Sequence, residues 1–423
     1  MIDRLRQFAA SIQLDDLPVR ARWSFADQIL VSGVNFLTTV FLVRALGLQE
    51  FGIYSMVMIG VQFLAGLQMA GILAPMMSLF DQRGSVPAPA YLATVLLHQT
   101  ALIATLIAAV LIAVALAGKA VPASVNVALA CCLVVATQVQ DLARRFFYVT
   151  ERPALAFTSD VIAYGCRLAA LALLAYQGSL TISLTWLVII AACIAALIPF
   201  VPDAAHARST SHDIKAVSER HRGIAGWLMA NNFVGWFGDA GFVLFMIGGL
   251  VGAADLGAVW AVFSVVLVVN LLLQSIENFV PSAATQALMQ GGGVAVRNYI
   301  DRVSVLGVVL ILSTVAALML LADPLMHLVF GRTFPAQLWI LAILGVNQAL
   351  VHVAMVVTAG LRALARVREV FVAQAVASAA SLVLVWPMTT AWGVIGALLT
   401  LLLVRVVLTA QLAVLLRRET QDR

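Results

Sequence analysis

A succession of long apolar runs constrains the fold of this chain more than any other feature. A helix needs about 20 mostly apolar residues to cross the hydrocarbon of a bilayer. Because lipid offers no hydrogen-bond partner to a bare backbone, each run predicts a helix and the fold class is all-α, a polytopic membrane protein. The sequence contains twelve such runs, at residues 23–43, 51–78, 91–117, 125–147, 154–176, 182–201, 225–250, 256–281, 302–322, 334–360, 368–389 and 391–415.

Composition supports the membrane assignment and argues against chemistry in water. The chain is 63% hydrophobic and 11% charged, whereas a soluble domain is roughly 45–50% apolar and about 25% charged. The net charge of +5 does not indicate a nucleic-acid partner. Four cysteines lie inside apolar runs without metal-ligand spacing, and no catalytic or phosphate-binding motif stands in a fitting context. We therefore expect no enzyme activity, metal or cofactor.

The positive charges predict the orientation in the membrane. If the gaps between runs alternate between the two sides, 20 of the 25 Lys and Arg residues fall on the side of both termini and three on the other. The positive-inside rule then places both termini in the cytoplasm. Residues 1–22 are predicted as a helix on the membrane surface or a frayed tail, residues 203–224 as a central cytoplasmic loop, and 416–423 as a tail.

The two halves of the sequence repeat one another. The pattern Gly-x-x-acid-apolar-Gly occurs from Gly47 to Gly52 and again from Gly252 to Gly257. Six spans in each half make both halves enter the membrane from the same side, so the repeat is parallel. We expect two six-helix lobes, residues 23–202 and 225–415, and parallel repeats with a site at their interface are typical of transporters.

Polar residues inside the predicted spans are the candidates for substrate binding, because a charge in the bilayer needs a cavity or a partner. Arg167, Arg405 and Asp239 lie near mid-span, and amides cluster on the first two spans of each half. For single amides, interhelical hydrogen bonding is the favoured interpretation, membrane anchoring can explain the peripheral arginines, and Arg167 could instead pair with Asp160. The candidate substrate-binding residues are Arg167, Arg405, Asn35, Arg44, Asn231, Asn232, Asp239, Gln274, Glu277, Arg145 and Arg362.

Two stretches near the N-terminus carry a resemblance to a known family. They are WSFADQILVSGVNFLTT, beginning at Trp23, and RALGLQEFGIY, beginning at Arg44. In them the chain resembles the polysaccharide-transport, O-antigen-type flippases of the multidrug/oligosaccharidyl-lipid/polysaccharide exporter superfamily. The resemblance implies two six-helix lobes around a cavity that faces each side of the membrane alternately. It also implies a lipid-linked oligosaccharide substrate, with the phosphate in the cavity and the lipid tail in the bilayer.

The function expected from the sequence is therefore translocation of a lipid-linked precursor of a lipopolysaccharide or exopolysaccharide by alternating access. Membrane lipid, a coupling ion (H⁺ or Na⁺) and polysaccharide-assembly proteins are the expected partners. A multidrug-type cation-coupled antiporter of the same fold is the first alternative, and an acid-rich cavity with few arginines would favour it. A membrane-embedded polysaccharide polymerase or ligase is the second, but such enzymes usually carry a long outer loop that this sequence lacks.

Overall fold

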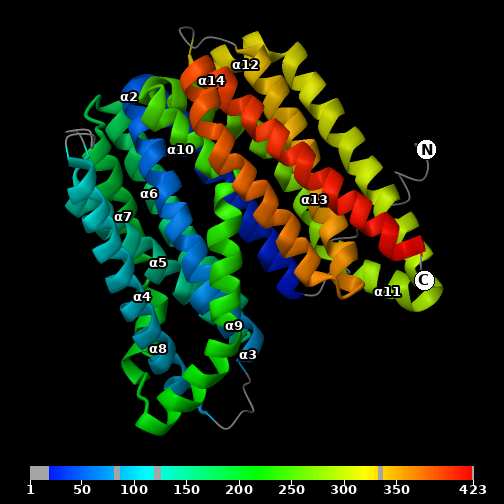
Figure 1. Cartoon of the computed structure of the whole chain (residues 1–423). Coiled ribbons are helices and arrows are strands. Elements are labelled where there is room, and N and C mark those ends of the chain that lie inside the picture. The colour runs from blue at the N-terminus through cyan, green and yellow to red at the C-terminus, as the bar shows by residue number, and fades with distance from the viewer. Residues whose placement is uncertain (1–18, 81–85, 119–124, 332–336, 422–423) are drawn as a thin grey trace. The chain divides into compact units, whose positions relative to one another are not determined.

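The computed structural model describes residues 19–80, 86–118, 125–331 and 337–421, with no side-chain description for 19–25 and 268–279. Every regular element in these ranges is a helix (Figure 1). The elements are α2 (Val19–Gln68), a π-helical turn (Met69–Leu73), α3 (Ala74–Leu79), α4 (Ala88–Ala117), α5 (Val127–Val149), α6 (Pro153–Tyr176), α7 (Ile182–Ala195), a 3₁₀ turn (Ile198–Phe200), α8 (Val201–His206), α9 (Ser211–Phe237), α10 (Ala240–Leu250), α11 (Ala253–Leu320), α12 (Ala322–Phe330), α13 (Leu338–Ala363) and α14 (Val367–Gln421).

The described helices account for the twelve predicted passes. Three of them, α2, α11 and α14, have 50, 68 and 55 residues, more than twice what a bilayer requires. Each contains glycine with non-helical backbone angles, at Gly47, at Gly291 and Gly292, and at Gly393. Dividing the long helices there, and counting α9 with α10 as one bent span, gives twelve passes in the described part of the chain. The prediction of an all-α, twelve-helix membrane fold is confirmed.

The chain packs as two units, and each is described by itself. The first unit comprises residues 1–38 and 68–226, and the second comprises 39–67 and 227–423. The long helix α2 therefore contributes its first part to one unit and its second part to the other. The predicted lobe boundaries, 23–202 and 225–415, differ from this division chiefly in the segment 39–67, which packs with the second unit.

The repeated glycine motif explains why the segment 39–67 packs there. Gly47 and Gly252 open the two copies with φ angles of 75° and 153°, which side chains with a Cβ rarely adopt. A Cβ on Gly52 would lie 1.7 Å from the carbonyl oxygen of Ala253, and one on Gly257 would lie 2.2 Å from that of Leu48. Residues 48 and 52 correspond to 253 and 257 in the repeat, so the contact is reciprocal, as expected for a local twofold relation.

The predicted loop over residues 203–224 is mostly helical, which corrects the sequence-based interpretation. Thr210 and Asp213 cap the start of α9 reciprocally, because each backbone N–H donates to the other's side chain, at 2.9 and 3.2 Å. These hydrogen bonds lower the pKa of the Asp213 carboxyl below its ordinary value. His221, expected to be solvated, is buried in the first unit with its Nε2 2.8 Å from the Tyr91 hydroxyl.

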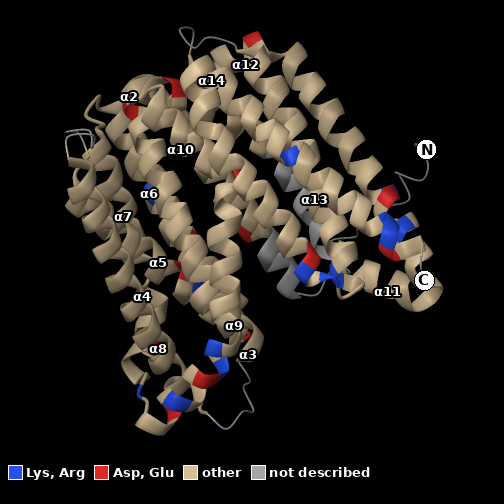
Figure 2. Ribbon diagram, viewed as in Figure 1, with Lys and Arg blue, Asp and Glu red and all other residues tan. Residues whose placement is uncertain are grey.

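Each unit has its own apolar core. Leu73, Leu142 and Phe147 are among the fully buried residues of the first, and Ile300 and Val356 are among those of the second. Figure 2 shows Lys and Arg gathered near α8 and the start of α9, and again near the C-terminus, while most of each helix is uncharged. Charge is therefore concentrated near helix ends, as the positive-inside analysis assumes. The predicted N-terminal surface helix, residues 1–22, lies outside the described residues apart from the start of α2.

Candidate functional site

The second unit encloses a cavity of about 610 Å³ that brings four of the predicted site residues together. Asn231, Asn232, Asp239 and Arg405 all line it. The wall combines polar and aromatic side chains, a mixture typical of sites that orient a ligand by a few polar groups. Its remaining polar and aromatic lining residues are Gln62, Phe63, Trp236, Trp260, Phe263, Asn347, Gln348 and Gln374.

Arg405 and Asp239 form an ion pair at this cavity. Arg405 Nη2 donates to Asp239 Oδ1 at 2.5 Å, and the two side chains are 10% and 60% exposed. Arg405 Nε is buried without a hydrogen-bond partner among the described residues. The arginine is thus fixed in the wall, while the carboxylate projects toward solvent-accessible space.

A break in the membrane span places Asp239 at the start of a helix. The helices α9 and α10 are bent by 49°, and Asp239 caps α10 by accepting a hydrogen bond from the Ala240 backbone N–H at 2.6 Å. A helix N-terminus carries a partial positive charge and unsatisfied N–H donors. The Asp239 carboxylate therefore lies between two positive groups, Arg405 and the start of α10.

The same unit has a smaller cavity, of about 420 Å³. Arg405 and Gln374 line both cavities, and the predicted site residue Arg362 lines the smaller one. Arg362 is exposed. Two of the predicted arginines of the second unit thus line cavities that share part of their walls.

Arg167 occupies a different environment, inside the first unit. Its Nη2 donates to the Asn35 Oδ1 at 2.7 Å, and its guanidinium lies 4.6 Å from the centre of the Tyr164 ring, a cation–π contact. Asp160, proposed from the sequence as its ion-pair partner, pairs instead with Arg144 at 2.5 Å. The structure therefore joins two predicted site residues, Arg167 and Asn35, in the first unit, whereas Arg405 belongs to the second.

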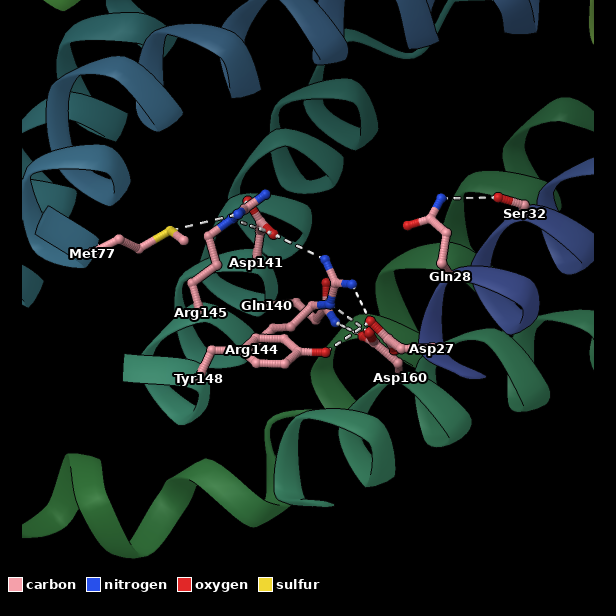
Figure 3. A network of polar contacts seen from close by, with 10 residues as sticks. All are labelled: Asp27, Gln28, Ser32, Met77, Gln140, Asp141, Arg144, Arg145, Tyr148 and Asp160. Carbon is pink, nitrogen blue, oxygen red and sulfur yellow. Dashed lines mark hydrogen bonds and ion pairs between the residues drawn. The ribbon is translucent and has the colours of Figure 1, made fainter. Parts of the chain in front are cut away.

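The first unit also contains a buried charge network (Figure 3). Arg144 pairs with Asp27 and Asp160, whose side chains are 2% and 0% exposed. Tyr148 donates to Asp27 at 3.1 Å, and Gln140 donates to Asp160 at 2.8 Å. One guanidinium thus compensates two buried carboxylates in the bilayer region, which is how intramembrane charges are usually tolerated.

Two of the remaining predicted residues, Arg44 and Arg145, make their contacts outside both sites. Arg44 donates to the carbonyls of Leu328 and Val329 near the end of α12 in the second unit, the latter at 2.8 Å. Arg145 pairs with Asp141 at 3.1 Å, one turn away on α5. Gln274 and Glu277 lie outside the residues whose side chains are described. Over the described residues, no group of three or more His, Cys, Asp or Glu side chains could hold a metal ion.

Several cavity residues carry no signal in the sequence. Gln374, Asn347 and Gln348 lie on spans α13 and α14, where isolated amides carry no periodic signal. Trp236 and Trp260 lie in apolar runs and could only be interpreted as packing or membrane-belt residues. All five are identified because they line the same cavity as Arg405.

The chain was compared with known families, curated proteins and solved structures. No known protein family matches it, and no curated protein matches it in sequence. The lipid II flippase MurJ in an inward closed conformation is similar at TM-score 0.71 and 13% identity, over 95% of this chain and 89% of the other.

Two transporters of the MOP superfamily are similar as well. An outward-facing multidrug resistance MATE transporter gives TM-score 0.61 and 14% identity, over 95% of both chains. A transporter from Pyrococcus furiosus, with a binding pocket described as having reverse polarity, gives a TM-score of 0.54 and 14% identity, over 95% of this chain and 92% of the other. The chain therefore has the MOP-superfamily fold, two lobes of transmembrane helices, at an identity that shows the fold alone.

Proposed function

We propose that this chain translocates a phosphate-bearing, lipid-linked oligosaccharide across the membrane, and that the 610 Å³ cavity of its second unit holds the polar head of that substrate. The observation that carries the proposal is the composition of the cavity wall. Amides, aromatic rings and one arginine converge there, in a fold shared with a lipid II flippase. The lipid tail would stay in the bilayer.

The charges of the cavity suit an anionic head group. Arg405 and the N-terminus of α10 create a positive place that the Asp239 carboxylate now occupies. Because Asp239 is 60% exposed, its side chain can swing away. A phosphate can then take its position with both positive groups as partners. Asp239 acts in this scheme as an internal anion that the substrate displaces.

The uncharged part of the wall suits a glycan. Asn231, Asn232 and Gln374 offer amide donors and acceptors, which match the many hydroxyls of a sugar. Trp236 and Trp260 offer large flat apolar faces on which a sugar ring can lie. A hydrophobic drug would leave most of these amides without partners, at a cost in affinity.

The runner-up is cation-coupled antiport of a drug, and one observation favours it. Asp239 is the more exposed member of its ion pair and could bind a cation directly. Asp239→Asn separates the two functions, because asparagine caps a helix about as well as aspartate but carries no charge. Antiport requires the carboxylate and should be lost, whereas translocation of an anion should persist.

Glycan export in cells that depend on this chain tests the proposal. Arg405→Ala should abolish export at normal protein levels, and Arg405→Lys should retain part of it, because lysine keeps the charge but not the planar fork. Arg297→Ala is the matched control, since Arg297 pairs with Asp301 in the same unit outside the cavity. Normal export by an Arg167→Ala and Arg405→Ala double variant would contradict the proposal.

Three further points belong to the proposal. The membrane is a bacterial inner membrane, as the resemblance to O-antigen-type flippases implies. Both chain termini lie in the cytoplasm, as the 20-to-3 charge distribution predicts. A coupling ion, H⁺ or Na⁺, drives the cycle, because this chain shows no motif for ATP hydrolysis. The product passes to polysaccharide-assembly proteins. Reporter fusions after Arg222 and after Arg418 should both report the cytoplasm.

A further inference from the structure

The two arms of α14 are its parts before and after Gly393. A groove of about 690 Å³ runs between these arms and is separate from the cavities described above. On the first arm its wall includes Arg368, Val372 and Val376, each one turn after the other. On the second arm it includes Ala410, Val414 and Arg418, again at four-residue spacing. The arms run in opposite directions, so each apolar stripe ends in an arginine at the same end of the groove. The stripes are about 12 Å long.

The groove faces away from the smaller cavity. Val370 and Gln374 line that cavity, and each is two positions from Val372, which lines the groove. Two residues turn a helix by about 200°, so the two hollows lie on opposite faces of the arm. Val372, Val376 and Val414 are 46–52% exposed. In a span, exposed valines of this kind face lipid.

The two arginines at the end of the groove are available for a ligand. One acid, Glu369, also lines the groove, and it pairs with Arg366 at 3.2 Å, which pairs in turn with Glu419 at 2.7 Å. Arg368 and Arg418 are exposed and make no ion pair with another described residue. The Oε1 atom of Gln411, which also lines the groove, is buried without a partner among the described residues.

We infer that this groove binds an anionic phospholipid of the surrounding membrane, with its phosphate between Arg368 and Arg418 and an acyl chain along the valine stripes. Basic pockets between transmembrane helices recognise phosphate head groups in this way, and the apolar stripe supplies the place for the chain. The groove's opposite orientation from the substrate cavity favours a resident membrane lipid over the transported molecule. The inference does not rest on the proposed function.

Lipid retention by the purified full-length protein tests the inference. Native mass spectrometry should show that phosphatidylglycerol is retained in preference to phosphatidylcholine with the same acyl chains. Because each arginine near a membrane surface contributes a roughly fivefold preference, the Arg368→Gln and Arg418→Gln double variant should lower the preference about 30-fold. Ala410→Phe should also lower retention, because it fills the groove and leaves every charge in place.

A matched control separates a specific site from general attraction. Arg297 and Arg417 lie in the same unit but do not line the groove, so the Arg297→Gln and Arg417→Gln double variant should change the preference by less than about threefold. An equal loss in both double variants, or full retention in Ala410→Phe, would overturn the inference. Displacement of phosphatidylglycerol by a polyprenyl diphosphate would assign the groove to the substrate's tail and overturn it as well.

Discussion

The two units differ in how their interior polar residues are satisfied. At matching places in the repeat the first unit has Asp27 and the second has Asn231. Asp27 is sealed and compensated by Arg144, whereas Asn231 lines a cavity. One unit therefore uses its polar groups to hold helices together, whereas in the other they line the cavity in which we propose that the substrate binds.

The amides follow the same division. In the first unit Gln68 donates to Gln99 at 3.0 Å, and Gln99 donates to the side chain of Gln138 at 3.1 Å, all three being buried. This ladder joins α2, α4 and α5. In the second unit Asn231 and Asn232 open onto the 610 Å³ cavity instead. Amides in similar sequence positions therefore differ in the structure, because some bond to one another and others line a cavity.

Removing Arg144 should have the largest effect on stability. Arg144→Ala leaves two buried carboxylates without a cation, and breaking a buried pair costs about 3–5 kcal/mol. Arg145→Ala is the neighbouring control, because Arg145 pairs with a partly exposed Asp141 and should cost at most about 1 kcal/mol. Thermal unfolding of the purified proteins measures both. Adding Asp27→Asn and Asp160→Asn should restore part of the loss, and equal losses for the two arginines would show that the network is not sealed.

The reciprocal glycine contact in the second unit should be the feature whose loss has the next largest effect on stability. Gly52→Ala and Gly257→Ala each place a Cβ within 2.2 Å of a backbone carbonyl, so each should cost about 1–3 kcal/mol or more. Gly60→Ala in the same helix meets nothing within 4 Å and should be neutral or slightly stabilising. Similar unfolding temperatures for Gly52→Ala and Gly60→Ala would contradict the reciprocal contact.

The smallest stability effects should distinguish sealed amides from cavity amides. Gln99→Ala leaves the Gln138 side chain buried without its donor, which should lower the free energy of unfolding by about 1–3 kcal/mol. Asn232→Ala should change stability by less than about 0.5 kcal/mol, since surface-like positions rarely contribute more, yet it should reduce export. If Asn232→Ala destabilised the protein as much as Gln99→Ala, the comparison between the units would fail.

Much of the fold could be predicted from the sequence, because apolar runs of fixed length and alternating positive charge are local signals. The repeat motif also indicated two lobes, and its glycines make the contact that joins 39–67 to the second unit. The helical character of residues 211–224 was missed because a polar segment near the centre of the chain has the composition of a loop.

The candidate site could be predicted only in part. Arg405, Asp239, Asn231 and Asn232 were selected as polar residues in lipid, and the structure places all four around one cavity. The pairing of Arg144 with Asp27 joins residues 117 positions apart, which no local pattern encodes. Arg44 and Arg145 illustrate the converse, because a charge near a span can serve a helix end or a neighbouring turn.

We expect Arg405 and the start of α10 to bind a phosphate in place of Asp239. The most direct test is the binding of a polyprenyl diphosphate to the purified protein. The fluorescence of the cavity tryptophans Trp236 and Trp260 can report this binding. Asp239→Asn should bind up to about tenfold more tightly than the unmodified protein, a gain of about 1.4 kcal/mol, and Arg405→Ala should bind at least tenfold more weakly. Weaker binding in Asp239→Asn, or unchanged binding in Arg405→Ala, would contradict the account.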